Sequence, residues 1–293
     1  MSLLLAVAPE HRSWAEGWSG AGEWELRESG DSLDDLAQGR ARGAVVPWNL
    51  RRETRGRVVA IPPRPEPRDL LVPASGAFVL GTLAAGSRVA LAGPRRRALL
   101  AAHRPDLEAV DCRELGQDAS SDPDAASLLA AGAVDAVVLS AGEARATGLA
   151  ARASQILEPK AWTPGPGQGA GVLVVASDDA QAAGILARLD DPPSRAALEA
   201  EEILARRLGF GPRGALGSLA LPYGRWLRLW GLLASGGTVR SGEDPVERPI
   251  RVVRADASGS DQDPAELADR VARLLRQRGA DLLPEPATPR EAS

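Results

Sequence analysis

Three consecutive arginines, Arg95 to Arg97, are the first residues whose types and spacing suggest chemistry. They stand where the apolar run "SRVALAG" gives way to the stretch "RALLAAH", so the sequence predicts that they begin a helix. Guanidinium groups near a helix N-terminus form a site for carboxylates or phosphates. A solvated basic face is the alternative, because the chain has one lysine, Lys160, and draws nearly all its positive charge from arginine.

Other reactive side chains are few. Arg68 and Asp69 in "EPRDLLVPASG" suggest either a structural ion pair or an active-site pair. Cys112 is the only cysteine, which excludes an intrachain disulfide and a multi-cysteine metal site. Since only two histidines, His11 and His103, accompany it, we expect no metal site. Cys112 itself is either a small buried hydrophobic residue or a nucleophile.

Two glycine-rich stretches remain. "LARRLGFGPRGALGSL" predicts a helix that runs into a loop, where a reactive side chain is often displayed, but the centre of that loop is Pro212. Proline carries no nucleophile, no titratable proton and no backbone N–H. "TPGPGQGAG" (163–171) lacks the spacing and the trailing Lys-Ser/Thr of a phosphate-binding loop. We therefore interpret it as a crossing between domains.

Composition limits the class of protein. A chain of 293 residues with 44% hydrophobic and 25% charged residues is typical of a multidomain globular protein. The net charge of −4 argues against a general polyanion binder, so we expect no nucleic-acid partner. "MSLLLAVAPEHR" lacks the basic start and apolar length of a secretory signal, and the longest uncharged run is broken by proline and glycine. We expect a cytoplasmic protein that does not contact membranes.

The elements that must position these residues alternate between strands and helices. "GAVVPW", "GRVVAI", "SRVALAG", "DAVVLSAG" and "GVLVVAS" are short apolar runs typical of buried strands, and helical stretches lie between them, which indicates an α/β protein. A helix is expected over 194–208 with Ser194 as its cap. Beyond it, "RWLRLWGLLASGGTVRSG" and "RPIRVVRAD" predict antiparallel strands, with Trp226, Arg228 and Trp230 on one face and Leu227 and Leu229 on the other. "DPAELADRVARLLRQRG" predicts a last helix capped by Asp263.

Taken in order, "PRDLLV", "RRRALLAAHRPDLEAVDCR", "AGAVDAVVLSAG", "PGPGQGA" and "EEILARRLGFG" resemble the hydroxymethylbilane synthase family, also called porphobilinogen deaminase. The resemblance extends from about Asp34 to about Leu283. It implies three domains around a cleft: domain 1 over 1–70 and 166–191, domain 2 over 71–165 and domain 3 over 192–283. The first two would resemble the lobes of a periplasmic binding protein, and the third would be a small α+β domain. We expect the tail, 284–293, to be disordered.

The resemblance also implies where the family chemistry would lie. The family anchors a covalent dipyrromethane cofactor on a loop cysteine, and Pro212 occupies the matching position here. Since proline forms no thioether, we expect no such cofactor. The family's Lys-Asp pair, whose aspartate handles protons and stabilises positively charged pyrroles, matches Asn49 and Leu50. Leu50 does neither, so the catalytic and cofactor positions are both degenerate.

The arginines that hold pyrrole carboxylates in the family match Arg95, Arg96, Arg113 and Arg152, whereas a further one is lost near Ala119. We expect at least three of these guanidinium groups to line one cleft between the first two domains. Being partly exposed, they would contribute little to stability. Cys112 precedes Arg113 on an expected strand end, so it would face away from the cleft and could not replace the lost anchor.

The resulting hypothesis is a divergent family member, related to tetrapyrrole biosynthesis, without the standard polymerising activity but with an arginine-lined cleft. Its ligand would be a pyrrole or tetrapyrrole polycarboxylate. One alternative is an active deaminase that uses a non-covalent primer or acts on a related pyrrole. Others are a binding or partner protein without catalysis, and a structural subunit whose arginines are solvated.

Overall fold

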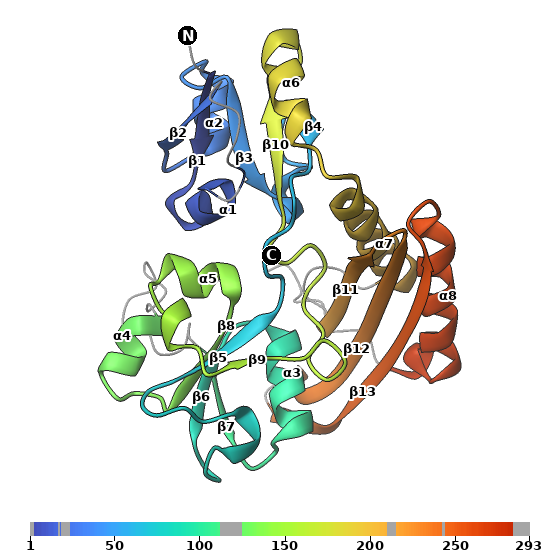
Figure 1. Cartoon of the computed structure of the whole chain (residues 1–293). Coiled ribbons are helices and arrows are strands. Elements are labelled where there is room, and N and C mark those ends of the chain that lie inside the picture. Colours follow the sequence, from blue (N-terminus) through green and yellow to red (C-terminus); the bar gives the residue numbers. More distant parts are fainter. Residues whose placement is uncertain are drawn as a thin grey trace.

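The fold is built on three separate β-sheets, as Figure 1 shows. The computed structural model describes residues 3–16, 18, 24–111, 125–209, 215–241 and 244–283. Two five-stranded sheets, each covered by helices, form two α/β lobes, and a three-stranded sheet with two helices forms a third domain. The predicted α/β class with a small α+β third domain is confirmed.

The first sheet has the strand order β2-β1-β3-β10-β4. Its strands are β1 (Leu3–Val7), β2 (Trp24–Glu28), β3 (Gly43–Pro47), β4 (Arg57–Ala60) and β10 (Gly171–Val175). Strands β1, β2 and β3 are parallel, whereas β10 runs antiparallel to both β3 and β4. The helices of this lobe are α1 (Arg12–Glu16), α2 (Ser32–Ala37) and α6 (Ala180–Leu186).

The second sheet repeats this plan with the order β7-β6-β8-β5-β9. Its strands are β5 (Asp69–Pro73), β6 (Arg88–Leu91), β7 (Glu108–Asp111), β8 (Ala136–Ser140) and β9 (Gln155–Ile156). Strands β6, β7 and β8 are parallel, and β5 is antiparallel to β8. Its helices are α3 (Pro94–His103), α4 (Ala125–Ala130) and α5 (Ala141–Ala146).

The chain crosses between these two lobes twice. It leaves the first sheet after β4 and enters the second at β5, and it returns through residues 157–170 to add β10 between β3 and β4. The returning crossing contains the "TPGPGQGAG" segment that the sequence assigned to such a connection. Both crossings therefore lie beside each other where the lobes meet.

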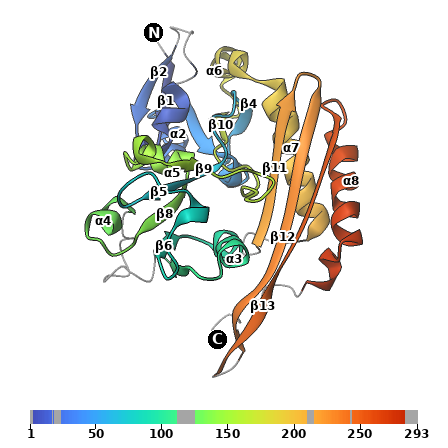
Figure 2. The same ribbon diagram turned by 60° about the horizontal axis from the view of Figure 1, so that its bottom comes forward.

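The third domain is an antiparallel meander of β11 (Ala215–Tyr223), β12 (Trp226–Ser241) and β13 (Asp244–Ser260). Helices α7 (Pro192–Leu208) and α8 (Pro264–Gln277) pack on one face of this sheet, and α3 of the second lobe lies against the other face (Figure 2). The predicted alternation along β12 is confirmed, since Leu227 and Leu229 are fully buried on the helix face while Trp226 is exposed on the other. The predicted cap of α8 is also confirmed, because the Asp263 side chain accepts a hydrogen bond from the Glu266 amide at 2.9 Å.

One helix boundary differs from the prediction. Asp191, not Ser194, caps α7, and its carboxylate accepts a hydrogen bond from the Ser194 amide at 2.9 Å. The two prolines between them fit the first turn of a helix, because that turn needs no amide donors. Ser194 Oγ instead accepts from the Arg64 amide at 3.0 Å and so holds the first crossing against α7.

No helix within the described part of the chain is both long and apolar enough to cross a membrane.

A glycine lets the third sheet approach the returning crossing closely. A Cβ atom on Gly217 of β11 would lie 2.8 Å from the Thr163 carbonyl oxygen, which is backbone and cannot move aside. The Ser218 amide donates to the Pro164 carbonyl at 2.8 Å and fixes this approach. We therefore expect Gly217→Ala to lower the free energy of unfolding by about 1–3 kcal/mol, measured by thermal and chemical denaturation.

The matched control is Gly184→Ala in α6, where nothing lies within 4 Å of the added Cβ. Helix propensity predicts a gain of about 0.5–1 kcal/mol there. Equal unfolding midpoints for the two variants would contradict the close approach.

Candidate functional site

The two lobes face each other through the carboxyl ends of their parallel strands, which is where α/β sheets bind ligands. In the second lobe, β6 and β8 end at Leu91 and Ser140, and α3 and α5 begin directly after them. Because β5 is antiparallel to β8, its first residue, Asp69, pairs with Ser140 at this same edge. The site therefore centres on Asp69 and on the first turns of α3 and α5.

Asp69 is fully buried and accepts hydrogen bonds on both carboxylate oxygens. Its Oδ2 accepts from Arg95 Nη2 and from Trp162 Nε1, each at 2.9 Å. Its Oδ1 accepts from Arg96 Nη2 at 2.9 Å and from Gln168 Nε2 at 2.8 Å. One carboxylate thus joins β5, α3 and the returning crossing.

The charges of this cluster are balanced within the protein. Burial by itself would raise the pKa of the Asp69 carboxyl, but the attraction of Arg95 and Arg96 and their hydrogen bonds hold it well below its usual range. Arg96 Nη2 also donates to Glu143 Oε2 of α5 at 2.8 Å. Burial lowers the pKa of Arg95, whereas the two carboxylates beside Arg96 outweigh its burial and raise its pKa. Both guanidinium groups stay charged, since arginine is not deprotonated in proteins.

The expectation that these arginines are partly exposed is wrong. Arg95 is 9% exposed and Arg96 is 6% exposed, and both are bonded to a carboxylate in the interior. Two cations in the first turn of a helix are unfavourable beside the positive end of its dipole. Asp69 compensates them, so the structure turns them inward instead of presenting them to solvent.

The suggested pairing of Arg68 with Asp69 is also corrected. Arg68 Nε donates to Glu66 Oε1 at 2.7 Å, two residues earlier in the chain. Asp69 turns to the interior toward α3 instead, because successive side chains of an extended chain point to opposite sides.

Arg152 does not join Arg95 and Arg96. It ends a short 3₁₀ helix, Ala150–Arg152, where its exposed side chain donates to the Ala74 carbonyl at 3.0 Å. Ala74 follows the far end of β5, about 13 Å along the strand from Asp69. The structure therefore brings two of the predicted arginines together and separates the third. Arg113, Cys112 and Pro212 lie outside the described residues.

Asn49 and Leu50 lie at the carboxyl end of β3 in the first lobe, in the short 3₁₀ helix Trp48–Leu50. Both are exposed, and 36% of the Leu50 surface is accessible. Trp48 anchors this turn in the interior, and the Arg51 guanidinium stacks 3.5 Å above its ring. Arg51 in turn forms an ion pair with Glu202 of α7. Asn49 and Leu50 are thus held at the surface between the first lobe and the third domain.

The lobes touch near the start of α5. The Trp14 ring of α1 packs against Gly142, where an added Cβ would lie 3.4 Å from Trp14 Nε1, and against Gly171 of β10. His11 lies over the same tryptophan ring at 4.2 Å between centroids. Aromatic side chains of the first lobe therefore fill the space at this point between the two carboxyl edges.

Sequence reasoning missed Glu201, a second fully buried carboxylate. Its Oε1 accepts from Arg64 Nη1 at 2.5 Å and from the Ala220 amide at 2.8 Å, while Oε2 accepts from the Gly167 amide at 2.7 Å. The available signal was its place in α7, where it shares the apolar stripe of Ala197 and Leu204. A charged residue on a buried stripe needs a partner, and here it has three.

Gly167, one of those partners, is a position where glycine is required. Its φ is +69°, and a Cβ would lie 2.2 Å from Cδ1 of Trp48. The returning crossing can therefore pass directly over the Trp48 ring and reach Glu201.

Comparisons of the sequence with known proteins find relatives with one name. The family model "Porphobilinogen deaminase, dipyromethane cofactor binding domain" matches residues 46–184. Porphobilinogen deaminase of Roseiflexus castenholzii is 37% identical over 223 residues, which cover 76% of this chain and 67% of the relative. The protein of that name from Xanthomonas euvesicatoria is 36% identical over 222 residues, 75% of this chain and 67% of the relative.

Among solved structures, the second substrate binding domain of a putative amino acid ABC transporter from Streptococcus pneumoniae gives a TM-score of 0.40 at 12% identity. That match covers 64% of this chain and 91% of that chain.

The buried cluster generates a stability prediction. Asp69→Asn leaves Arg95 and Arg96 without their shared counter-charge, and breaking a buried pair in this way costs about 3–5 kcal/mol of unfolding free energy. Because the folded pKa of Asp69 is depressed, its contribution is complete above about pH 4 and is lost as the pH falls below that value. Denaturation at a series of pH values should show stability falling more steeply below pH 4 in the wild type than in the variant.

Asp106→Asn is the matched control, because the Asp106 side chain is 40% exposed where it pairs with Arg104 at 2.6 Å. Exposed pairs contribute little, so this variant should unfold near the wild-type midpoint. A midpoint for Asp69→Asn close to that of the control would show that Asp69 does not hold the lobe together.

Proposed function

The chain belongs to the porphobilinogen deaminase family, and we propose that it acts in tetrapyrrole biosynthesis without the standard porphobilinogen-polymerising activity. The observation that carries this proposal is the leucine at position 50, at the carboxyl end of β3. Family resemblance assigns to that position an aspartate that moves protons and stabilises positively charged pyrroles. A hydrocarbon side chain does neither, and the loss of such a group typically lowers rates by about 10²–10⁴-fold.

Two glutamates lie near Leu50 and could in principle replace the family's aspartate. Glu202 is engaged by both Arg51 and Arg52. Glu53 follows Leu50 by one turn, with its amide donating to the Leu50 carbonyl at 2.9 Å, and its side chain is exposed. Of the described acidic residues close in sequence to Leu50, Glu53 is therefore the one to test as a substitute.

The arginines of the second lobe support the same proposal. Substrate carboxylates would have to displace Asp69 and Glu143 from Arg95 and Arg96, whose charges these two residues already balance. Arg152 lies away from them. We therefore do not extend the proposal to an arginine-lined cleft that holds several carboxylates of a pyrrole ligand at once.

The covalent dipyrromethane of the family does not fit this sequence. The matched family model carries the cofactor in its name, but position 212 is a proline and the chain has a single cysteine, Cys112. α7 ends at Leu208, and Gly209 leads into the loop in a left-handed conformation with φ of +71°. The helix that would present the anchor is present, and the thiol is not.

The first test is the intact mass of the protein. Expressed in a host that makes porphobilinogen, the purified chain should have the mass of its bare polypeptide, allowing for removal of the initiator methionine. An adduct of dipyrromethane size with a positive Ehrlich colour reaction would contradict the proposal, and its location at or away from Cys112 would identify the anchor.

The second test is turnover of porphobilinogen. Wild type and Pro212→Cys should both give little or no hydroxymethylbilane, because the single substitution returns the thiol but leaves Leu50 in place. Pro212→Cys combined with Leu50→Asp should give more product than Pro212→Cys alone. Wild-type turnover that is abolished by Glu53→Gln would instead show an active enzyme with a relocated carboxylate.

A further inference from the structure

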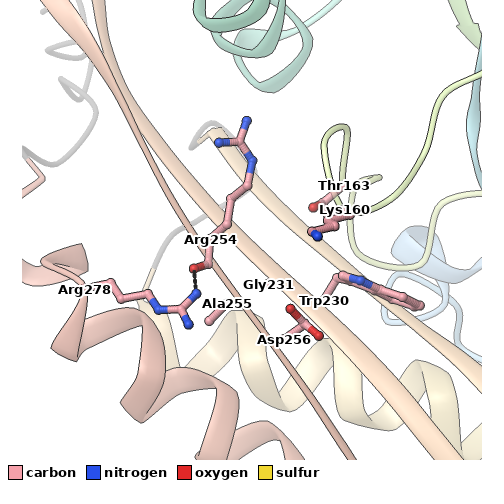
Figure 3. A pocket seen from close by; sticks show the side chains of 8 residues that line it. All are labelled: Lys160, Thr163, Trp230, Gly231, Arg254, Ala255, Asp256 and Arg278. Carbon is pink, nitrogen blue, oxygen red and sulfur yellow. Dashed lines mark hydrogen bonds between the residues drawn. The ribbon is translucent and has the colours of Figure 1, made fainter.

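A pocket separate from the Asp69 cluster lies between the returning crossing and the third sheet (Figure 3). It measures about 130 Å³. Lys160 and Thr163 line it from the crossing, Trp230 from β12, Arg254 and Asp256 from β13, and Arg278 from the residue after α8. The pocket is therefore built from two parts of the chain that belong to different domains.

Cationic side chains outnumber carboxylates around this pocket. Lys160, Arg254 and Arg278 are positively charged, and Asp256 is the one carboxylate among the lining residues. Asp256 already bonds to Arg228 at 2.8 Å, so its charge is matched outside the pocket. Arg278 Nη1 donates to the Arg254 backbone carbonyl at 2.5 Å, and the Arg254 side chain points away from that contact (Figure 3). The three lining cations are left with an excess of positive charge.

Arg254 is unusual among the arginines of the described residues. Its Nε is buried and lacks a hydrogen-bond partner, while its Nη2 donates to the Ala161 carbonyl at 3.3 Å. It forms no ion pair with a carboxylate of the described chain, and burial lowers the pKa of its guanidinium with no opposing charge. A half-buried cation without a counter-charge is costly, in contrast to Arg95 and Arg96, which share Asp69.

We propose that this pocket binds a tetrahedral inorganic oxyanion, phosphate or sulfate, between Lys160 and Arg254. Cations reach the pocket from three separate segments, which suits an ion with oxygens in several directions better than a planar carboxylate, for which one bidentate arginine suffices. A doubly charged ion also offsets more of the positive excess. A cavity of about 150 Å³ holds a benzene molecule, so a pocket of 130 Å³ admits an ion of this size but not a nucleotide.

Such an ion would connect the third sheet to the returning crossing. Lys160 stands three residues before Thr163, whose carbonyl oxygen accepts from Arg95 Nη1 at 2.9 Å. The connection therefore continues into the Asp69 cluster of the second lobe. Because the pocket exists only when these parts are assembled, the bound ion stabilises the folded protein in proportion to its concentration.

The test is calorimetric titration of the full chain with inorganic phosphate, repeated with sulfate and with acetate. Phosphate and sulfate should each bind at one saturable site, more weakly as sodium chloride is raised, and acetate should bind at least about tenfold more weakly. Lys160→Gln and Arg254→Gln should each raise the phosphate Kd by about tenfold or more. Arg206→Gln removes the same charge from an exposed position of α7 and should leave the Kd unchanged.

Thermal unfolding without phosphate shows whether each variant folds. Lys160 is exposed and forms no ion pair with a described residue, so Lys160→Gln keeps the test valid even where Arg254→Gln is unstable. Absence of saturable phosphate binding, an unchanged Kd in Lys160→Gln, or acetate binding as tight as phosphate would each overturn the proposal. None of these measurements depends on turnover of porphobilinogen.

Discussion

The second lobe and the crossing that leads out of it depend on one buried carboxylate. Asp69 accepts from two arginines of α3, a tryptophan and a glutamine, and no water is needed to complete its hydrogen bonds. A buried ion pair contributes little net stability compared with apolar packing, yet it strongly penalises any arrangement that leaves one partner alone. The cluster therefore specifies how β5, α3 and residues 162–168 meet.

Glu201 does the same for the third domain. It binds Arg64 on the first crossing, the Gly167 amide on the second, and the Ala220 amide on β11. Gln168, adjacent to Gly167, bonds to Asp69. Two buried carboxylates thus hold the connections between the lobes: Asp69 of the second lobe bonds to the returning crossing, and Glu201 of the third domain bonds to both crossings. Displacing the third domain would break the contacts of Glu201 together with the close approach of Gly217 to Thr163.

The sequence predicted five buried strands, the two long antiparallel strands and the helices of the third domain, but few of the contacts between elements. The five apolar runs, the two-sided pattern of β12 and the cap of α8 depend on residues close together in the chain, and local periodicity reveals these. The partners of Asp69 are 26 to 99 residues away, so their distance in sequence hides them. The sequence suggested its neighbour Arg68 as a partner, but the Arg68 side chain bonds to Glu66. The sequence places Arg95 and Arg96 at the start of a helix, but their burial depends on the carboxylate of Asp69, which only the folded chain brings beside them.

The insertion of β10 between β3 and β4 has a consequence for biosynthesis. The strands of the second sheet all lie between residues 69 and 156, whereas the first sheet lacks the strand that joins β3 to β4 until residues 171–175 have been made. On a ribosome, the second lobe can thus close before the first. Until then β3 has an open side and β4 has no strand beside it, and unpaired strand edges of this kind are sites of aggregation. The strands of the amino-terminal lobe are therefore synthesised first, but their edges stay unpaired until β10 has been made.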